Sequence, residues 1–136
     1  MKKVLFLLIC LILLFSISAS YISAAENTVM PRFNNASYAN ASFTINSSGV
    51  ATINASYDGY EGITTGAKIT ILLEKKTFFF FWSDVQEWTI SSNESYGSFT
   101  RSCTVEEGDY RATVTFEISG SGGATDVIER ELEYSY

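Results

Sequence analysis

Histidine is absent from this 136-residue sequence, proline occurs once, and cysteine occurs twice. Without histidine, a His-based catalytic triad is excluded, and the common transition-metal sites lack their usual imidazole ligand. No phosphate-binding loop and no cluster of metal-binding residues occurs in the sequence. We therefore expect neither an enzyme of the familiar classes nor a bound cofactor or metal.

Long apolar runs are also missing, with one exception near the N-terminus. Two lysines precede an apolar run of 14 residues, 4–17, which is shorter than the roughly 20 residues needed to span a bilayer. Ser23-Ala24-Ala25 fits the small-x-small rule for cleavage of a secretion signal. The pattern predicts a cleaved signal peptide over residues 1–25 and a secreted, extracellular protein that begins at Glu26. The alternative is an uncleaved membrane anchor, which is the one way in which we expect this chain to meet a membrane.

Basic residues are scarce once this leader is removed. All 15 acidic residues remain and two of the nine basic residues are lost, which leaves a net charge of −8. That sign disfavours binding to nucleic acid or to anionic lipid headgroups. Cys103 is then the one remaining thiol, so no intrachain disulfide forms. We expect Cys103 to be a small buried apolar residue, with an intermolecular disulfide as the alternative.

Short stretches of alternating apolar and polar residues, separated by turn-forming residues, make up the rest of the chain. No segment after the leader repeats at helical spacing. Residues 26–40, which include Pro31, read as an extended lead-in, and residues 41–136 as one domain. The pattern predicts an all-β, antiparallel, seven-stranded sandwich with strands at 42–45, 50–57, 68–75, 85–90, 99–105, 110–118 and 125–134.

The segment Glu106-Glu107-Gly108-Asp109-Tyr110-Arg111-Ala112 resembles the tyrosine corner of immunoglobulin-like domains. The resemblance implies that Tyr110 begins the sixth strand and that its hydroxyl bonds back to the upstream backbone. Ala112 occupies the position of the second disulfide cysteine, and the third strand contains no tryptophan, so an antibody-type domain is excluded. A single immunoglobulin-like β-sandwich remains the predicted fold.

A second resemblance covers most of the chain after the leader. It rests on the order and spacing of Leu73-Glu74-Lys75-Lys76, Trp82, Val85, Trp88, Gly97-Ser98 and Gly108-Asp109-Tyr110-Arg111. In these features the chain is similar to a family of small secreted β-sandwich proteins of unassigned function from Gram-positive bacteria. The resemblance implies a bacterial origin, the same fold and the same compartment. It implies no chemistry.

Five consecutive aromatic residues lie between the third and fourth predicted strands: Phe78, Phe79, Phe80, Phe81 and Trp82. Successive side chains in a strand alternate between faces, so two or three of the five should be exposed at the tip of the hairpin. Exposed aromatic clusters often mark contact sites. The segment is therefore the predicted binding site for a protein, a glycan or the cell envelope. The alternative is a plug that covers the open end of the sandwich, with Trp88 in the core in either case.

The sequence contains other polar features that could bind a ligand or carry a modification. A Ca²⁺ site from Asp58, Glu61 or the turn at 106–109 is an alternative, but no loop of spaced oxygen ligands is present. Asn-x-Ser triplets begin at Asn35, Asn40, Asn46, Asn54 and Asn93, which in a bacterial protein carry no glycan by default. We expect a non-catalytic binding module. The alternatives are a structural component of a surface or matrix and a hydrolase with an unrecognised pair of carboxylates.

Overall fold

A computed structural model of the chain describes residues 32–136. These residues form seven strands and no helix, so no described helix offers a membrane-spanning segment. The strands are β1 (Ala36–Ile45), β2 (Val50–Gly59), β3 (Thr64–Thr77), β4 (Phe81–Ser92), β5 (Tyr96–Thr104), β6 (Asp109–Gly120) and β7 (Asp126–Ser135). The prediction of an all-β, seven-stranded antiparallel fold is confirmed. The predicted signal peptide at 1–25 lies outside the described residues.

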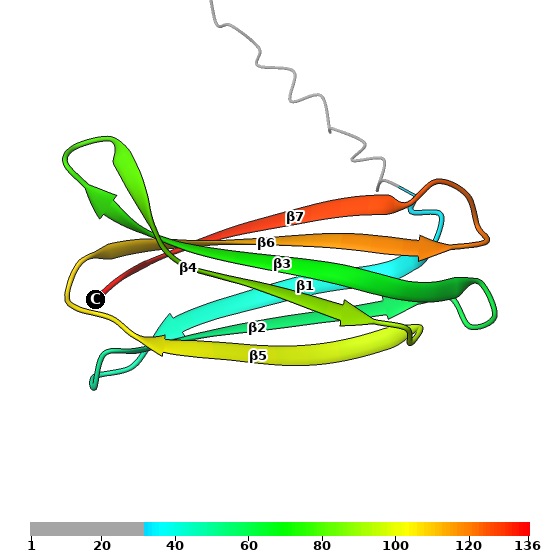
Figure 1. Cartoon of the computed structure of the whole chain (residues 1–136), viewed down its shortest axis with the longest axis horizontal. Coiled ribbons are helices and arrows are strands. Elements are labelled where there is room, and N and C mark those ends of the chain that lie inside the picture. Colours follow the sequence, from blue (N-terminus) through cyan, green and yellow to red (C-terminus); the bar gives the residue numbers. More distant parts are fainter. Residues whose placement is uncertain (1–31) are drawn as a thin grey trace, which may run out of the picture. The chain divides into compact units, whose positions relative to one another are not determined.

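The strands form two sheets that pack face to face. One sheet has three strands in the order β1-β2-β5, and the other has four in the order β4-β3-β6-β7 (Figure 1). All neighbours pair antiparallel. In constant-type immunoglobulin domains the fourth strand joins the sheet of strands one, two and five. Here β4 pairs with β3 instead, so the β3–β4 hairpin lies within a single sheet.

Alternate residues of each strand point into the space between the sheets, as the period of two in the sequence predicts. Ile69, Ile71 and Leu73 of β3 and the apolar residues Val114, Phe116 and Ile118 of β6 have no exposed surface. Burying one such side chain stabilises the fold by about 1.5–3 kcal/mol. The core is a single cluster to which both sheets contribute.

Cys103 and Trp88 pack against the edge of this core. Both are half-buried. Burial raises the pKa of the Cys103 thiol above its ordinary value, because desolvation disfavours the thiolate. Both side chains therefore lie at the margin of the core and are less buried than the sequence predicts.

The tyrosine corner is present in the described fold. Tyr110 is 2% exposed at the start of β6, and its hydroxyl donates to the Glu106 carbonyl at 2.8 Å. This bond fixes the turn that carries the chain from β5 in one sheet to β6 in the other.

Strand β1 begins at Ala36, inside the segment 26–40 that the sequence predicts to be a lead-in. A buried carboxylate explains the early start. Asp126, which is 7% exposed, accepts hydrogen bonds from the backbone N–H groups of Asn34, Asn35 and Ala36 at 2.9, 2.6 and 3.0 Å. The fully buried Asn35 side chain donates to the Ala124 carbonyl at 2.9 Å and accepts from the Gly122 N–H at 3.1 Å. We call this group the Asn35–Asp126 lock.

Candidate functional site

The predicted aromatic segment lies at the turn of the β3–β4 hairpin. Thr77 pairs with Phe81, which leaves Phe78, Phe79 and Phe80 as a three-residue loop. The four phenylalanines at 78–81 are 86, 81, 86 and 71% exposed, and we call them the phenylalanine cluster. None of the four rings is buried in the core, so the alternative of a plug over the end of the sandwich is wrong for this cluster.

More of these side chains are exposed than strand alternation predicts. Phe78–Phe80 lie in a turn and not in a strand, so their side chains do not alternate between a buried and an exposed face. Phe78 has a φ of 49°, which is the left-handed region that a bulky side chain rarely adopts. The rings of Phe79 and Phe80 lie 6.4 Å apart and are tilted to one another.

The hairpin extends beyond the rest of its sheet. Pairing between β3 and β6 ends at Lys75 and Tyr110, whereas pairing between β3 and β4 continues to Thr77 and Phe81. The last residues of the hairpin therefore have no third strand beside them. Figure 1 shows this end of the hairpin standing clear of the two sheets. The phenylalanine cluster is a convex protrusion and not the wall of a groove.

A bulge lies at the point where the hairpin leaves the sheet. Leu73 pairs with Gln86 and Glu74 pairs with Asp84, so Val85 has no partner in the β3 register. An extra residue of this kind bends the strand and increases its local twist. Val85 is 41% exposed, and the bulge aims the tip away from the core.

Trp82 differs from the four phenylalanines because it lies at the base of the tip and is half-buried. Its register partner is Lys76. The Arg111 guanidinium carbon lies 4.5 Å from the centre of the Trp82 ring, and the Lys76 ammonium nitrogen lies 5.8 Å from it. Both distances are within the range of cation–π attraction. Trp82 is thus held against the outer face of the four-stranded sheet.

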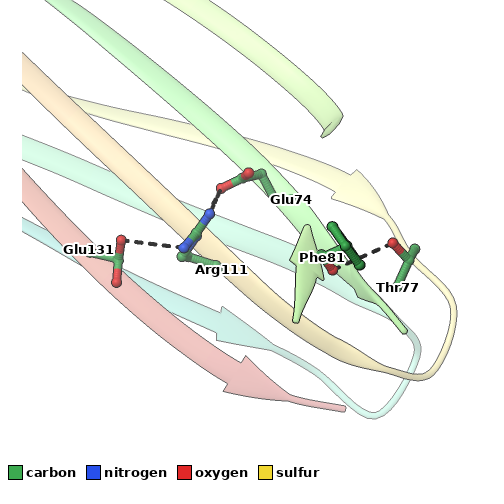
Figure 2. A network of polar contacts seen from close by, with 5 residues as sticks. All are labelled: Glu74, Thr77, Phe81, Arg111 and Glu131. Atoms are coloured by element: carbon green, nitrogen blue, oxygen red, sulfur yellow. Dashed lines mark hydrogen bonds and ion pairs between the residues drawn. The ribbon is translucent and has the colours of Figure 1, made fainter. Parts of the chain in front are cut away.

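Arg111 is the polar centre that ties the hairpin base to the sheet (Figure 2). Its Nε and one terminal nitrogen lie 2.9 and 2.8 Å from the same Glu74 Oε2, and its other terminal nitrogen lies 3.7 Å from Glu131 Oε2. Glu74 is only 8% exposed, so this ion pair is shielded from water and its geometry is well defined. Arg111 therefore links β3, β7 and, through Trp82, β4.

Thr77 stabilises the base of the turn through its hydroxyl group. Its hydroxyl donates to the Phe81 carbonyl at 3.4 Å (Figure 2). The same hydroxyl lies 3.2 Å from the Ser83 hydroxyl. No sequence pattern marks Arg111, Glu74 or Thr77 as part of the site. Arg111 and Glu74 are 37 positions apart in the chain, and only the pairing of β3 with β6 brings them together.

The two outer faces of the sandwich differ in charge. Register places the side chains of Glu74, Asp84, Glu87, Glu117, Glu129, Glu131 and Glu133 on the outer face of the four-stranded sheet. The outer face of the three-stranded sheet carries mainly Ser, Thr and Asn from Asn40 to Thr104. On that face the Thr100 hydroxyl donates to Asn54 at 2.7 Å, and the Asn54 amide donates to Ser42 at 3.3 Å.

Two surface hollows lie on the described domain. One is lined by residues that include Phe33, Tyr60 and Ile63, and the other lies around Lys68 and Glu117. Glu117 is the one carboxylate among their lining residues, and it forms an ion pair with Lys68 at 2.8 Å. The hydrogen bond to Glu117 and the charge of Glu117 raise the pKa of Lys68. Within residues 32–136, no three His, Cys, Asp or Glu side chains gather as a metal site. This holds for Asp58, Glu61 and the turn at 106–109.

The chain matches no protein-family model, no curated protein and no solved structure.

Proposed function

We propose that this protein is a non-catalytic secreted or cell-surface module that binds its partner through the phenylalanine cluster. The observation that carries the proposal is the exposure of four consecutive phenylalanines, each at 71% or more. Contiguous exposed apolar groups of this kind are costly in water and favour aggregation, so a soluble domain keeps them where they make a contact.

The backbone of the tip supports the same proposal. A phenylalanine in the left-handed region costs on the order of 1–2 kcal/mol relative to ordinary backbone. Phe78 makes no buried contact that offsets this cost, since it is 86% exposed. Strain without a folding benefit is typical of residues kept for a contact.

The base of the tip is rigid, as a contact element requires. The ion pairs of Arg111 and its contact with Trp82 fix the hairpin to the sheet. Because the base is fixed before binding, less conformational entropy is lost when a partner is bound. The exposed rings and the fixed base together describe a preformed binding surface.

We place this module outside the cell because of the predicted leader at 1–25, and in a bacterium because of the family resemblance described above. Mass spectrometry of the exported protein tests the first point, with Glu26 or a near neighbour expected as the first residue. An intact leader on a membrane-bound product would overturn it.

The experiment for the binding role replaces Phe78, Phe79, Phe80 and Phe81 together by Ser. A matched control replaces Tyr96 and Val127, which are 68 and 65% exposed, by Ser. Labelled wild-type and control proteins should bind to cells of the producing species or their isolated envelopes, and the tip variant should not. If the tip variant bound as well as the wild-type protein, the proposal would be wrong.

A further inference from the structure

We propose that the partner of the phenylalanine cluster is a lipid bilayer, into whose interfacial region the four rings insert. The inference rests on the proposed contact role of the tip and goes beyond it by naming the partner. It concerns the folded domain, and it departs from the sequence-based expectation that this chain meets a membrane only through an uncleaved leader.

The chemistry of the cluster favours an apolar medium over a protein or a glycan. The four side chains at 78–81 carry no hydrogen-bond donor or acceptor. Protein interfaces favour Tyr, Trp and Arg, whose polar ends pair with the partner, and small-molecule sites are concave. This tip is convex and its rings are purely apolar, so hydrocarbon is the environment that satisfies it best.

The residues below the rings match the layers of a bilayer surface. Trp82 and Lys76 form the second pair below the loop, after Thr77 and Phe81, and the Lys76 side chain is exposed. Tryptophan and lysine are the residues that occupy the headgroup level, the first with its amphipathic ring and the second with its charge in water. From the tip downward the hairpin therefore presents apolar rings, then an amphipathic ring, then charge.

The backbone of the loop limits how deeply it can insert. None of the turn hydrogen bonds of residues 32–136 involves Phe78, Phe79 or Phe80, so their N–H and C=O groups need water or lipid headgroups. Groups of this kind are not tolerated in the hydrocarbon core. The rings reach the acyl chains while the backbone stays at the boundary, at a depth of about 5–10 Å.

The charge of the domain determines which lipids suit it. The chain after the leader carries a net charge of −8, and the outer face of the four-stranded sheet is acidic. Anionic headgroups repel such a domain, so insertion is driven by the rings and not by Coulomb attraction. We expect uncharged membranes to be bound at least as well as anionic ones.

The test measures flotation with protein-free vesicles of phosphatidylcholine, and with vesicles that also contain phosphatidylglycerol. It uses residues 26–136, which include the whole compact unit Arg32–Tyr136 and omit the apolar run at 4–17. Replacing one ring by Ser should lower the partition coefficient about tenfold, and replacing all four should abolish flotation. The control with Ser at Tyr96 and Val127 should float like wild type.

A spectroscopic readout reports on depth. In a Trp88→Phe background, Trp82 is the one remaining tryptophan. Its emission should shift to the blue on vesicles, and lipids brominated near the headgroup should quench it more than lipids brominated deep in the chain. Binding should persist in about 0.5 M salt. Such salt shortens the range of electrostatic attraction to a few ångströms but does not weaken the insertion of apolar rings.

Three outcomes overturn the membrane inference. They are no flotation with either vesicle, flotation that the four Ser substitutions leave unchanged, and flotation that requires phosphatidylglycerol and is lost in salt.

If cells are bound through the rings but vesicles are not, a protein or glycan is the partner and the proposed function stands. If a ring-dependent dimer forms in solution and vesicles are not bound, a second copy is the partner. If the rings are dispensable for both cells and vesicles, both proposals fail.

Discussion

Hydrogen bonds from single buried side chains fix the ends of several strands in this sandwich. Tyr110 is buried, and its hydroxyl donates to the Glu106 carbonyl. Tyr110→Phe should lower the free energy of unfolding by about 1–2 kcal/mol, because one partly buried hydrogen bond is lost while the ring still fills its site. Denaturant melts measure this. Tyr96→Phe, at a residue 68% exposed, is the control and should melt like wild type; equal stability of the Tyr110 variant would contradict the corner role.

Asp126 fixes the start of β1 through its carboxylate group. Its two carboxylate oxygens accept three backbone N–H groups in a buried site. Asp126→Asn puts an NH₂ group against at least one of those donors, so the free energy of unfolding should fall by about 2–4 kcal/mol. Asp58→Asn makes the same change at an exposed residue and should cost under about 0.5 kcal/mol. Urea unfolding of the two variants measures this difference. Equal free energies of unfolding would show that the Asn35–Asp126 lock does not stabilise the fold.

These two residues also show how far sequence reasoning reaches. Tyr110 bonds to a residue four positions upstream, so a local motif is sufficient to predict it. Asp126 bonds to residues about 90 positions away, and a single sequence carries no signal for that pairing. For the same reason the sequence pattern predicts too late a start for β1, whose first residues are held by a distant carboxylate and not by local alternation.

At the scale of the element, the β3–β4 hairpin combines a predictable body with a tip that alternation does not describe. The strands follow the apolar period of two, and the core residues Ile69, Ile71 and Leu73 were identifiable from it. The exposure of the tip depends on where the turn begins. Periodicity holds up to Thr77 and says nothing about a three-residue loop.

The left-handed conformation of Phe78 allows a test in which stability and binding change in opposite directions. Phe78→Gly relieves backbone strain but adds freedom to the unfolded chain, so the net effect should be a gain of about 0–1 kcal/mol in stability. Binding should weaken because one ring is lost. Thermal melts and vesicle flotation measure the two effects.

Phe79→Gly is the matched control, because Phe79 is equally exposed but is not among the residues with positive φ. It should lose binding to a similar degree without the gain in stability. A Phe78→Gly variant that melts clearly below wild type would show that the ring supports the fold.

The sandwich formed by residues 32–136 has two outer faces and four sheet edges. Strand β7 is an edge of the four-stranded sheet, and Glu129, Glu131 and Glu133 alternate along its outer side. If two copies paired antiparallel through β7, centred on Glu131, then Glu129 of one copy would lie opposite Glu133 of the other. Like charges directly opposite one another destabilise a pair of strands.

Replacing Glu129 and Glu133 by Gln should therefore increase self-association while leaving the melting temperature nearly unchanged. Sedimentation velocity over a range of concentrations measures this. Replacing Glu61 and Glu107 by Gln removes the same charge from exposed residues outside the strands and should have no effect. If both variants associate equally, net charge and not the strand edge is responsible.

The Asn35–Asp126 lock also governs when folding can finish. It joins the residue just before the first strand to the first residue of the last strand, so neither half of the chain contains it. A polypeptide is synthesised from its N-terminus towards its C-terminus. Until Asp126 has emerged, the backbone donors before β1 have no carboxylate to bind and the first strand stays unfastened at that end. The closing step is therefore delayed until Asp126 has been made, after the whole of strands β1 to β6.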